Sequence, residues 1–294
     1  MDKTKIEWAD ATWNPVTGCF HGCEYCYARR IAERFAPLCT PRLGDPGMEG
    51  AAKWDSDRGL DTMLELEKPY KPEGRVVPYP MGFFPTFHRY RLNQPAKWKE
   101  PRTIFVCSMA DLFGEWVPDE WIEAVFRACL DAPQHRYLFL TKNPECYQSL
   151  AYRGLLPKRD NFWYGSTATG PYKPVFYGEG FHTFVSVEPI LEDFGCCPDD
   201  PERSLASCTD WIILGAESGN RRDKVTPKAA WIEGLVADYS KWDKPVFMKD
   251  SLIPVVGEKN MRREFPWEDA EEAEKRIATG APRPRNDSGG EAAE

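Results

Sequence analysis

Hydrophobic residues occur along this chain in short runs that end abruptly in polar residues. Most runs are apolar throughout and do not alternate with polar positions, which is typical of strands buried on both faces of a sheet. They are also rich in β-branched and aromatic residues, as strands are. The predicted strands are Thr12 to Thr17, Thr103 to Cys107, Tyr137 to Leu140, Phe162 to Gly165, Thr183 to Val187, Trp211 to Leu214 and Pro245 to Met248.

Helical patterns separate several of these strands. In the clearest, Pro118 to Leu130, a proline and two acidic residues form a favourable first turn before an apolar stripe with helical spacing. Further helices are predicted over Tyr27 to Phe35, 144–150 and 227–238. Strands that alternate with helices imply right-handed crossovers and a parallel sheet. We therefore predict an α/β fold, a parallel (β/α) partial TIM-like barrel of about six to eight strands.

Two segments do not follow this alternation of strands and helices. Residues 37–100 are rich in proline, glycine and charge and are too long for a plain loop, so we predict an insertion with its own short strands after the first helix. Residues 268–294 carry eight acidic and four basic residues and are predicted to form an acidic, disordered tail. The predicted organisation is one barrel domain over residues 1–267, followed by this tail.

Composition narrows the class of protein. Hydrophobic residues make up 42% of the chain and charged residues 29%, the mix of a folded soluble protein. The net charge of -8 is not the basic excess of a protein that holds nucleic acid by charge alone. With no apolar signal core and no run of about 18 apolar residues, the protein is expected in the cytoplasm, without a membrane partner. In that reducing compartment, ten cysteines suggest metal ligands, catalytic groups or buried residues in place of disulfides.

The stretch TGCFHGCEYCYA places Cys19, Cys23 and Cys26 within eight residues, between the first predicted strand and the first predicted helix. Three thiolates can hold three irons of a 4Fe-4S cluster and leave the fourth iron open, whereas a structural zinc or an electron-transfer cluster needs four protein ligands. An open iron can bind a small molecule. A zinc site completed by His21, Cys39 or a distant residue is an alternative, as are three unrelated buried cysteines.

This Cys-x3-Cys-x2-Cys spacing, with an aromatic residue (Tyr25) just before the third cysteine, resembles the radical S-adenosylmethionine superfamily. The resemblance implies a 4Fe-4S cluster whose open iron chelates S-adenosylmethionine through its amino and carboxylate groups. It implies reductive cleavage to a 5'-deoxyadenosyl radical, which takes hydrogen from a substrate. It also implies a reductant such as flavodoxin or ferredoxin. The substrate is unknown, and a nucleic-acid base or lesion is one candidate.

Polar motifs follow most of the predicted strands: SMADLF (108–113), LTKNP (140–144), GST (165–167), SVEP (186–189), GAESG (215–219) and FMKD (247–250). Together with the opening IEW-x-DATWNP-x-TGC segment, they resemble a phage- and prophage-associated radical S-adenosylmethionine family over residues 5–255. Members of that family are mostly uncharacterised and are distantly similar to spore photoproduct lyase. Many have a longer spacing before the second cysteine, whereas this chain has the strict form.

In a parallel barrel, residues at the carboxyl ends of the strands converge on one mouth. The resemblance and the motif order together assign the cofactor-binding residues: Tyr25 for packing, Ser108 and Asp111 for the amino group, Lys142 for the carboxylate, Ser166 and Thr167 for the ribose, and Glu188 beyond them. Each has a structural alternative, such as capping a helix or turn, or a solvated position.

The substrate is expected farther along the mouth, facing the catalytic candidates Glu217, Lys249 and Asp250. Glu217, like Glu188, directly follows an apolar strand, where a free carboxylate is costly unless it has a partner. Lys249 and Asp250 could instead pair with each other.

Other groups carry weaker hypotheses. Cys196, Cys197, Cys208 and Cys39 could bind a second cluster or zinc, but their spacing matches no established pattern and free thiols are the simpler interpretation. The segment 87–102 interleaves basic and aromatic residues, as single-strand nucleic-acid binders do, or forms an exposed basic hairpin. A non-catalytic, metal- or cluster-containing nucleic-acid-binding protein is therefore the alternative function, and an electron-transfer protein is a third.

Overall fold

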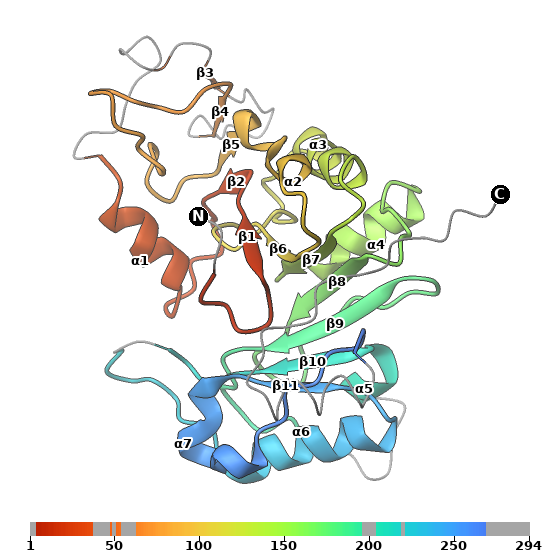
Figure 1. Ribbon diagram of the computed structural model, residues 1–294. Helices are drawn as coiled ribbons and strands as arrows, with labels where there is room; N and C mark the ends of the chain where they lie inside the picture. Colours follow the sequence, from red (N-terminus) through yellow and green to blue (C-terminus); the bar gives the residue numbers. More distant parts are fainter. Residues whose placement is uncertain are drawn as a thin grey trace, which may run out of the picture.

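The computed structural model describes residues 4–37, 48, 51–53, 63–195, 204–218 and 221–268. Its main feature is a seven-stranded sheet in which neighbouring strands pair in parallel, in the order β1-β6-β7-β8-β9-β10-β11. The sheet curls into a half-barrel, which confirms the predicted fold class (Figure 1). Its strands are β1 (Ala11–Trp13), β6 (Thr103–Val106), β7 (Arg136–Thr141), β8 (Phe162–Thr167), β9 (His182–Val187), β10 (Trp211–Leu214) and β11 (Val246–Met248).

Helices connect the strands, and several of them cover the outer face of the sheet. The α-helices are α1 (Tyr27–Arg34), α2 (Gln94–Lys97), α3 (Asp119–Leu130), α4 (Pro144–Tyr152), α5 (Leu205–Cys208), α6 (Ala229–Lys241) and α7 (Ile253–Val256). Short 3-10 turns span Arg89–Arg91, Asp250–Leu252 and Glu258–Asn260. The apolar stripe predicted for α3 is buried against the sheet, as expected for an amphipathic helix. Among the residues described, no helix has the length and apolarity that a bilayer crossing requires.

The two faces of the sheet bury different side chains. Alternate residues such as Tyr137, Phe139 and Tyr164 pack against the helices, and the residues between them fill the inside of the half-barrel. The inner layer is Phe105, Leu138, Trp163, Phe184, Trp211, Ile213 and Phe247, joined by Trp8 and Phe265. A Cβ at Gly165 would overlap the ring of Phe184, so the glycine makes room for this layer. Because these side chains fill the inside of the half-barrel, a ligand of the barrel would have to bind beyond them, at an end of the strands.

The insertion predicted over residues 37–100 carries short strands of its own, as expected. It forms a second sheet in the order β2-β5-β4-β3, from β2 (Val16–Thr17), β5 (Thr86–His88), β4 (Leu64–Leu66) and β3 (Ala51–Lys53). The prediction of one strand over Thr12 to Thr17 was wrong, because β1 belongs to the barrel and β2 to the second sheet. Pro15, which has no N–H to donate to a ladder, lies in the break between them.

The first basic and aromatic residues of segment 87–102 are held within the fold. Phe87 and His88 are fully buried, and His88 Nε2 lies 2.9 Å from Thr17 Oγ1. Arg89 donates to Glu65 at 2.7 Å. The alternative of an exposed basic hairpin is therefore wrong for these residues, because Phe87 and His88 are buried where β5 pairs with β2 and Arg89 is paired with Glu65 of β4. The predicted tail beyond residue 268 and the cysteines at 39, 196 and 197 lie outside the described residues.

Candidate functional site

The cysteine loop, defined here as residues 18–26, begins at a glycine that the geometry requires. Gly18 has a φ of +88°, and a Cβ there would overlap the carbonyl group of Phe84. The Gly18 N–H donates to Met109 O at 2.9 Å, and the Cys19 N–H donates to Phe83 O at 3.1 Å. The first turn of the loop is therefore held between the segment after β6 and the insertion.

The three cysteines of the loop are half-buried. Cys26 caps the amino end of α1, where its Sγ accepts a hydrogen bond from Arg29 N at 3.3 Å. Burial, with smaller contributions from the nearby Asp111, Cys23 and Cys26, raises the pKa of the Cys19 thiol to about 12. Since a coordinating thiol is deprotonated by the metal itself, this environment favours the thiol until metal is bound.

Three thiols are a donor set that a 4Fe-4S cluster can use. Among the residues that the structure describes, no three His, Cys, Asp or Glu side chains are grouped so as to hold one metal ion. A cubane cluster needs a different geometry, because each thiolate binds a different iron and the sulfurs do not converge on one point. The fourth zinc ligand considered above, His21, has its Nε2 atom 2.7 Å from the carboxylate of Asp111.

Asp111 connects the cysteine loop to the ends of β6 and β7. Its buried carboxylate accepts hydrogen bonds from Phe113 N at 3.0 Å, Thr141 Oγ1 at 2.8 Å and Lys142 N at 2.9 Å, besides its contact with His21. These four partners come from three separate segments of the chain. They favour a positioning role for Asp111, while its predicted contact with an amino group stays a prediction.

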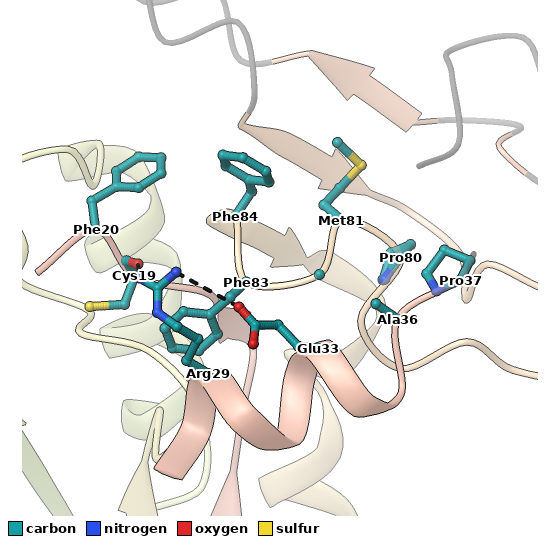
Figure 2. Close-up of a pocket in the computed structure, with 11 residues that line it drawn as sticks. Cys19, Phe20, Arg29, Glu33, Ala36, Pro37, Pro80, Met81, Phe83 and Phe84 are labelled. Carbon is teal, nitrogen blue, oxygen red and sulfur yellow. Dashed lines mark hydrogen bonds and ion pairs between the residues drawn. The ribbon is translucent and has the colours of Figure 1, made fainter. Parts of the chain in front are cut away.

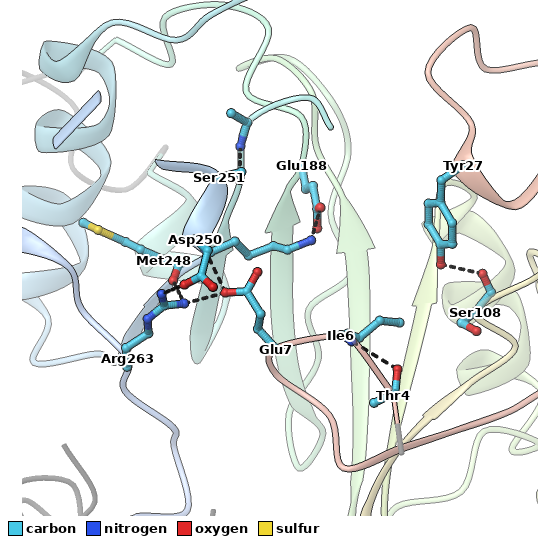
Figure 3. Close-up of polar contacts among 12 residues, drawn as sticks. Thr4, Ile6, Glu7, Tyr27, Ser108, Glu188, Met248, Asp250, Ser251 and Arg263 are labelled. Carbon is cyan, nitrogen blue, oxygen red and sulfur yellow. Dashed lines mark hydrogen bonds and ion pairs between the residues drawn. The ribbon is translucent and has the colours of Figure 1, made fainter. Parts of the chain in front are cut away.

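Two tyrosines of the same region contact predicted site residues. Lys142 Nζ lies 3.4 Å from the hydroxyl of Tyr25 and 5.4 Å from the centre of its ring. The hydroxyl of Tyr27 donates to Ser108 O at 2.7 Å (Figure 3). Burial raises the pKa of the Tyr25 phenol to about 12. The structure thus brings Tyr25, Ser108, Asp111 and Lys142 together around the cysteine loop.

A third contact reaches the cysteine loop from the end of β10. The buried carboxylate of Glu217 accepts two hydrogen bonds from Arg221, at 2.7 and 2.9 Å. The same guanidinium donates to Glu24, between two of the cysteines, at 3.1 Å. Hydrogen bonding to Arg221 holds the pKa of Glu217 below its usual range. Glu217 therefore has the charged partner that we expect for a carboxylate directly after an apolar strand.

Glu188 and Lys249 form an ion pair between the ends of β9 and β11 (Figure 3). The pair lies over Gly215, where an added Cβ would come within 3.1 Å of Glu188 and 3.2 Å of Lys249. Asp250 instead pairs with Arg263, which also donates to Glu7. The predicted pairing of Lys249 with Asp250 was therefore wrong. The cause is that the two side chains leave the strand end in different directions.

The two predicted ribose ligands lie on opposite faces of β8. Tyr164 belongs to the helix-facing core, so Ser166, two residues later, faces the same side. Ser166 is fully buried there and accepts a hydrogen bond from Phe176 N at 2.8 Å. Thr167 lies on the opposite face of β8, the face that carries Trp163 of the inner layer. The structure therefore brings Thr167 but not Ser166 to the inner side of the barrel.

Several residues of the site were not selected from the sequence for the role that they have, and His21 was considered only as a zinc ligand. His21, Glu24 and Arg221 make the contacts that fix the cysteine loop, and Asn14 Oδ1 accepts from Ser108 Oγ at 3.2 Å and from Met109 N at 2.9 Å. The available signal was their position, since two of them lie inside the cysteine motif and Arg221 closely follows Glu217.

No curated protein is significantly similar to this chain. Among solved structures, the chain is similar to spore photoproduct lyase complexed with dinucleoside spore photoproduct, with 12% sequence identity and a TM-score of 0.40. The match covers 82% of this chain but only 63% of that one, and a likeness this low carries no argument about the site. A family model, in contrast, matches residues 3–251, and the chain belongs to that family, which is described as "Protein of unknown function (DUF5131)".

Proposed function

We propose that the protein is a radical S-adenosylmethionine enzyme in which Cys19, Cys23 and Cys26 hold a 4Fe-4S cluster at the mouth of the half-barrel. The observation that carries the proposal is the fixing of the cysteine loop over the strand ends. His21 ties it to Asp111, and Glu24 ties it to Arg221. Preorganised ligands of this kind set the position of a cluster relative to the site beneath it.

The chemistry of the bound group would be the reductive cleavage of S-adenosylmethionine, which yields a 5'-deoxyadenosyl radical able to take hydrogen from a substrate. The residues of this chain would bind and orient the cofactor and the substrate, and would exclude water from them. Lys142, held against Tyr25, suits the carboxylate of the cofactor, because an ammonium group forms a charge-assisted hydrogen bond with it. Thr167 offers its hydroxyl to the ribose.

The paired Glu188 and Lys249 lie across the mouth from Lys142 in strand order and can accept and donate hydrogen bonds to cofactor or substrate. Glu217 is part of the same rim and holds Arg221 toward the cysteine loop. Asp250 stays outside the proposed site, because its carboxylate pairs with Arg263. The aromatic inner layer below the mouth excludes water from the barrel, which a reactive carbon radical requires.

The test is anaerobic reconstitution with iron and sulfide, followed by reduction in the presence of S-adenosylmethionine. We expect one 4Fe-4S cluster per chain by iron and sulfide analysis, and release of 5'-deoxyadenosine after reduction. Serine substitution of Cys19, Cys23 or Cys26 should remove most of the iron. The matched control is Cys208→Ser, at a half-buried cysteine outside the motif, which should retain it. Protein that binds zinc and no iron would overturn the proposal.

A further inference from the structure

The outward side of α1 carries an apolar stripe. Tyr27, Ile31 and Phe35, spaced four residues apart, are 41%, 39% and 53% exposed, so they lie along one side of the helix and contact solvent. The buried residues of α1 are Ala28 and Ala32, which face the insertion and the segment after β6. Large hydrophobic side chains aligned in this way mark a surface that binds another molecule.

This stripe is flanked by positive charge on an acidic protein. α1 and its cap region contain Arg29, Arg30, Arg34 and Glu33, a net charge of +2, whereas the whole chain carries -8. Arg29 pairs weakly with Glu33 at 4.0 Å, while Arg34 lies over the ring of Phe35 at 5.6 Å. An exposed surface that combines arginine with aromatic residues has the composition of a protein interface. Its charge favours an acidic partner.

On the opposite side of α1 from this stripe, beyond Arg30 and Arg34, a cavity reaches a cysteine of the loop. A cavity of about 340 Å³ opens between α1 and residues 80–84, with Arg29 and Glu33 on one wall and Phe83 and Phe84 on the other. Cys19 lies at its inner edge (Figure 2). Phe84 is 43% exposed and extends the apolar surface beyond the cavity. A molecule seated on α1 and in this cavity would therefore contact Cys19, a proposed cluster ligand.

We infer that α1 and the cavity beside it form the docking surface for an acidic, one-electron donor protein. This inference rests on the proposed function, because the donor delivers its electron to the cluster at the cysteine loop. The donor is oxidised by one electron and the cluster is reduced by one, with no bond formed or broken in the transfer. A second copy of this chain is the competing occupant, since its acidic surface would also suit the arginines.

The experiment reverses charge on the exposed arginines of α1, with Arg30→Glu and Arg34→Glu, and uses an acidic flavodoxin as the probe. Its matched control is Arg127→Glu, at an exposed arginine in the last turn of α3. Binding of oxidised flavodoxin to the cluster-free protein is measured first, by calorimetry at low and high salt. The α1 variants should weaken binding at least about tenfold and lose its salt dependence, and the control should not.

Cluster reduction is then followed by stopped-flow absorbance in reconstituted protein. The α1 variants should accept electrons from reduced flavodoxin at least about tenfold more slowly, while reduction by dithionite is unchanged. Ile31→Ser should also slow the transfer from flavodoxin, by removing apolar contact without changing charge. Equal effects in Arg127→Glu, or none in any α1 variant, would overturn the inference.

Two further outcomes separate this inference from the proposed function. If no cluster forms, the proposed function fails, but the binding measurement still decides whether the arginines of α1 dock an acidic protein. Sedimentation that shows a dimer, converted to monomer by Arg30→Glu, would assign the surface to a second copy and overturn the electron-donor assignment.

Discussion

His21 Nε2 lies 2.7 Å from Oδ2 of Asp111, although the two residues are 90 positions apart in the chain. This contact couples the cysteine loop to the hydrogen-bonded junction of β6 and β7, where Asp111 also binds Thr141 and the backbone of Lys142. Movement of Asp111 would therefore move both the proposed cluster ligands and the proposed cofactor ligand. The contact is the structural basis of the first prediction.

Replacing Asp111 by alanine should lower the free energy of unfolding by about 3 kcal/mol or more, because buried donors lose their acceptor. His21→Ala should cost less, about 1 to 2 kcal/mol, since Asp111 keeps its other donors. Both variants should retain less iron after reconstitution. Urea denaturation and iron analysis measure the two effects.

The control for these variants is Thr141→Val, which removes a donor to the same carboxylate without touching the cysteine loop. It should lower stability by about 1 kcal/mol and leave the iron content unchanged. A His21→Ala protein that keeps as much iron as the wild type would contradict the role given to this contact.

Gly18→Ala should destabilise the protein by about 2 kcal/mol or more, because the new side chain is strained at positive φ and overlaps Phe84. It should also displace Cys19 and reduce iron retention. Gly154→Ala is the matched control, since Gly154 has a φ of +70° with no atom within 4 Å of an added Cβ. The control should cost about 1 kcal/mol from strain alone and retain its iron. Equal losses in the two variants would count against the close contact at Gly18.

Arg221→Gln should move the midpoint of acid unfolding to higher pH. Arg221 holds the pKa of Glu217 below its unfolded value, so this carboxylate contributes stability above the unfolded pKa that is lost as pH falls through the folded pKa. Without Arg221, burial raises the pKa of Glu217 and the loss begins at higher pH. Circular dichroism during acid titration measures the shift. Glu24→Gln, at a largely exposed partner of the same arginine, should leave the midpoint in place, and coincident curves for Arg221→Gln and wild type would refute the prediction.

Because of His88, the free energy of unfolding should decrease as the pH falls below about 6.5. Burial, aided by the charge of Arg91, lowers the pKa of His88 well below its ordinary value, so the unfolded chain binds a proton that the folded chain does not. Stability contributed by the neutral ring is full above the unfolded pKa and declines by about 1.4 kcal/mol per pH unit below it.

His88→Gln should flatten this decline, even if it lowers stability at neutral pH by disturbing the contact with Thr17. Urea denaturation at several pH values measures the slope. His182→Gln, at a half-buried histidine on β9, is the control that should keep the wild-type slope. A slope that survives in His88→Gln would assign the pH dependence to other groups.

Much of the fold could be predicted from local sequence. The strands β6 to β11 appear as short apolar runs, and α3 appears as a stripe with helical spacing, because burial in a parallel α/β fold selects these patterns. The cysteine spacing and the polar residues after each strand could be read in the same way. The division into a domain over residues 1–267 and a tail stays a prediction.

The inward or outward direction of a strand residue could not be read from these runs. A strand buried on both faces has no alternation of polar and apolar residues, so nothing local distinguishes the two faces. Ser166 and Thr167 illustrate this, since packing against α4 and Phe176 decides which of them faces the helices. The break at Pro15 likewise depended on β5 being available to pair with β2.

The sequence alone therefore determined which segments form strands and helices and where the three thiols occur, because these depend on residues close together in the chain. Only the tertiary structure decided the partners of the site residues. Glu24 and Arg221 are 197 positions apart, and Lys249 turns to Glu188 in place of its neighbour Asp250. Such pairings follow from the curl of the sheet and the packing of its core, which bring distant strand ends to one mouth, and no local spacing records that geometry.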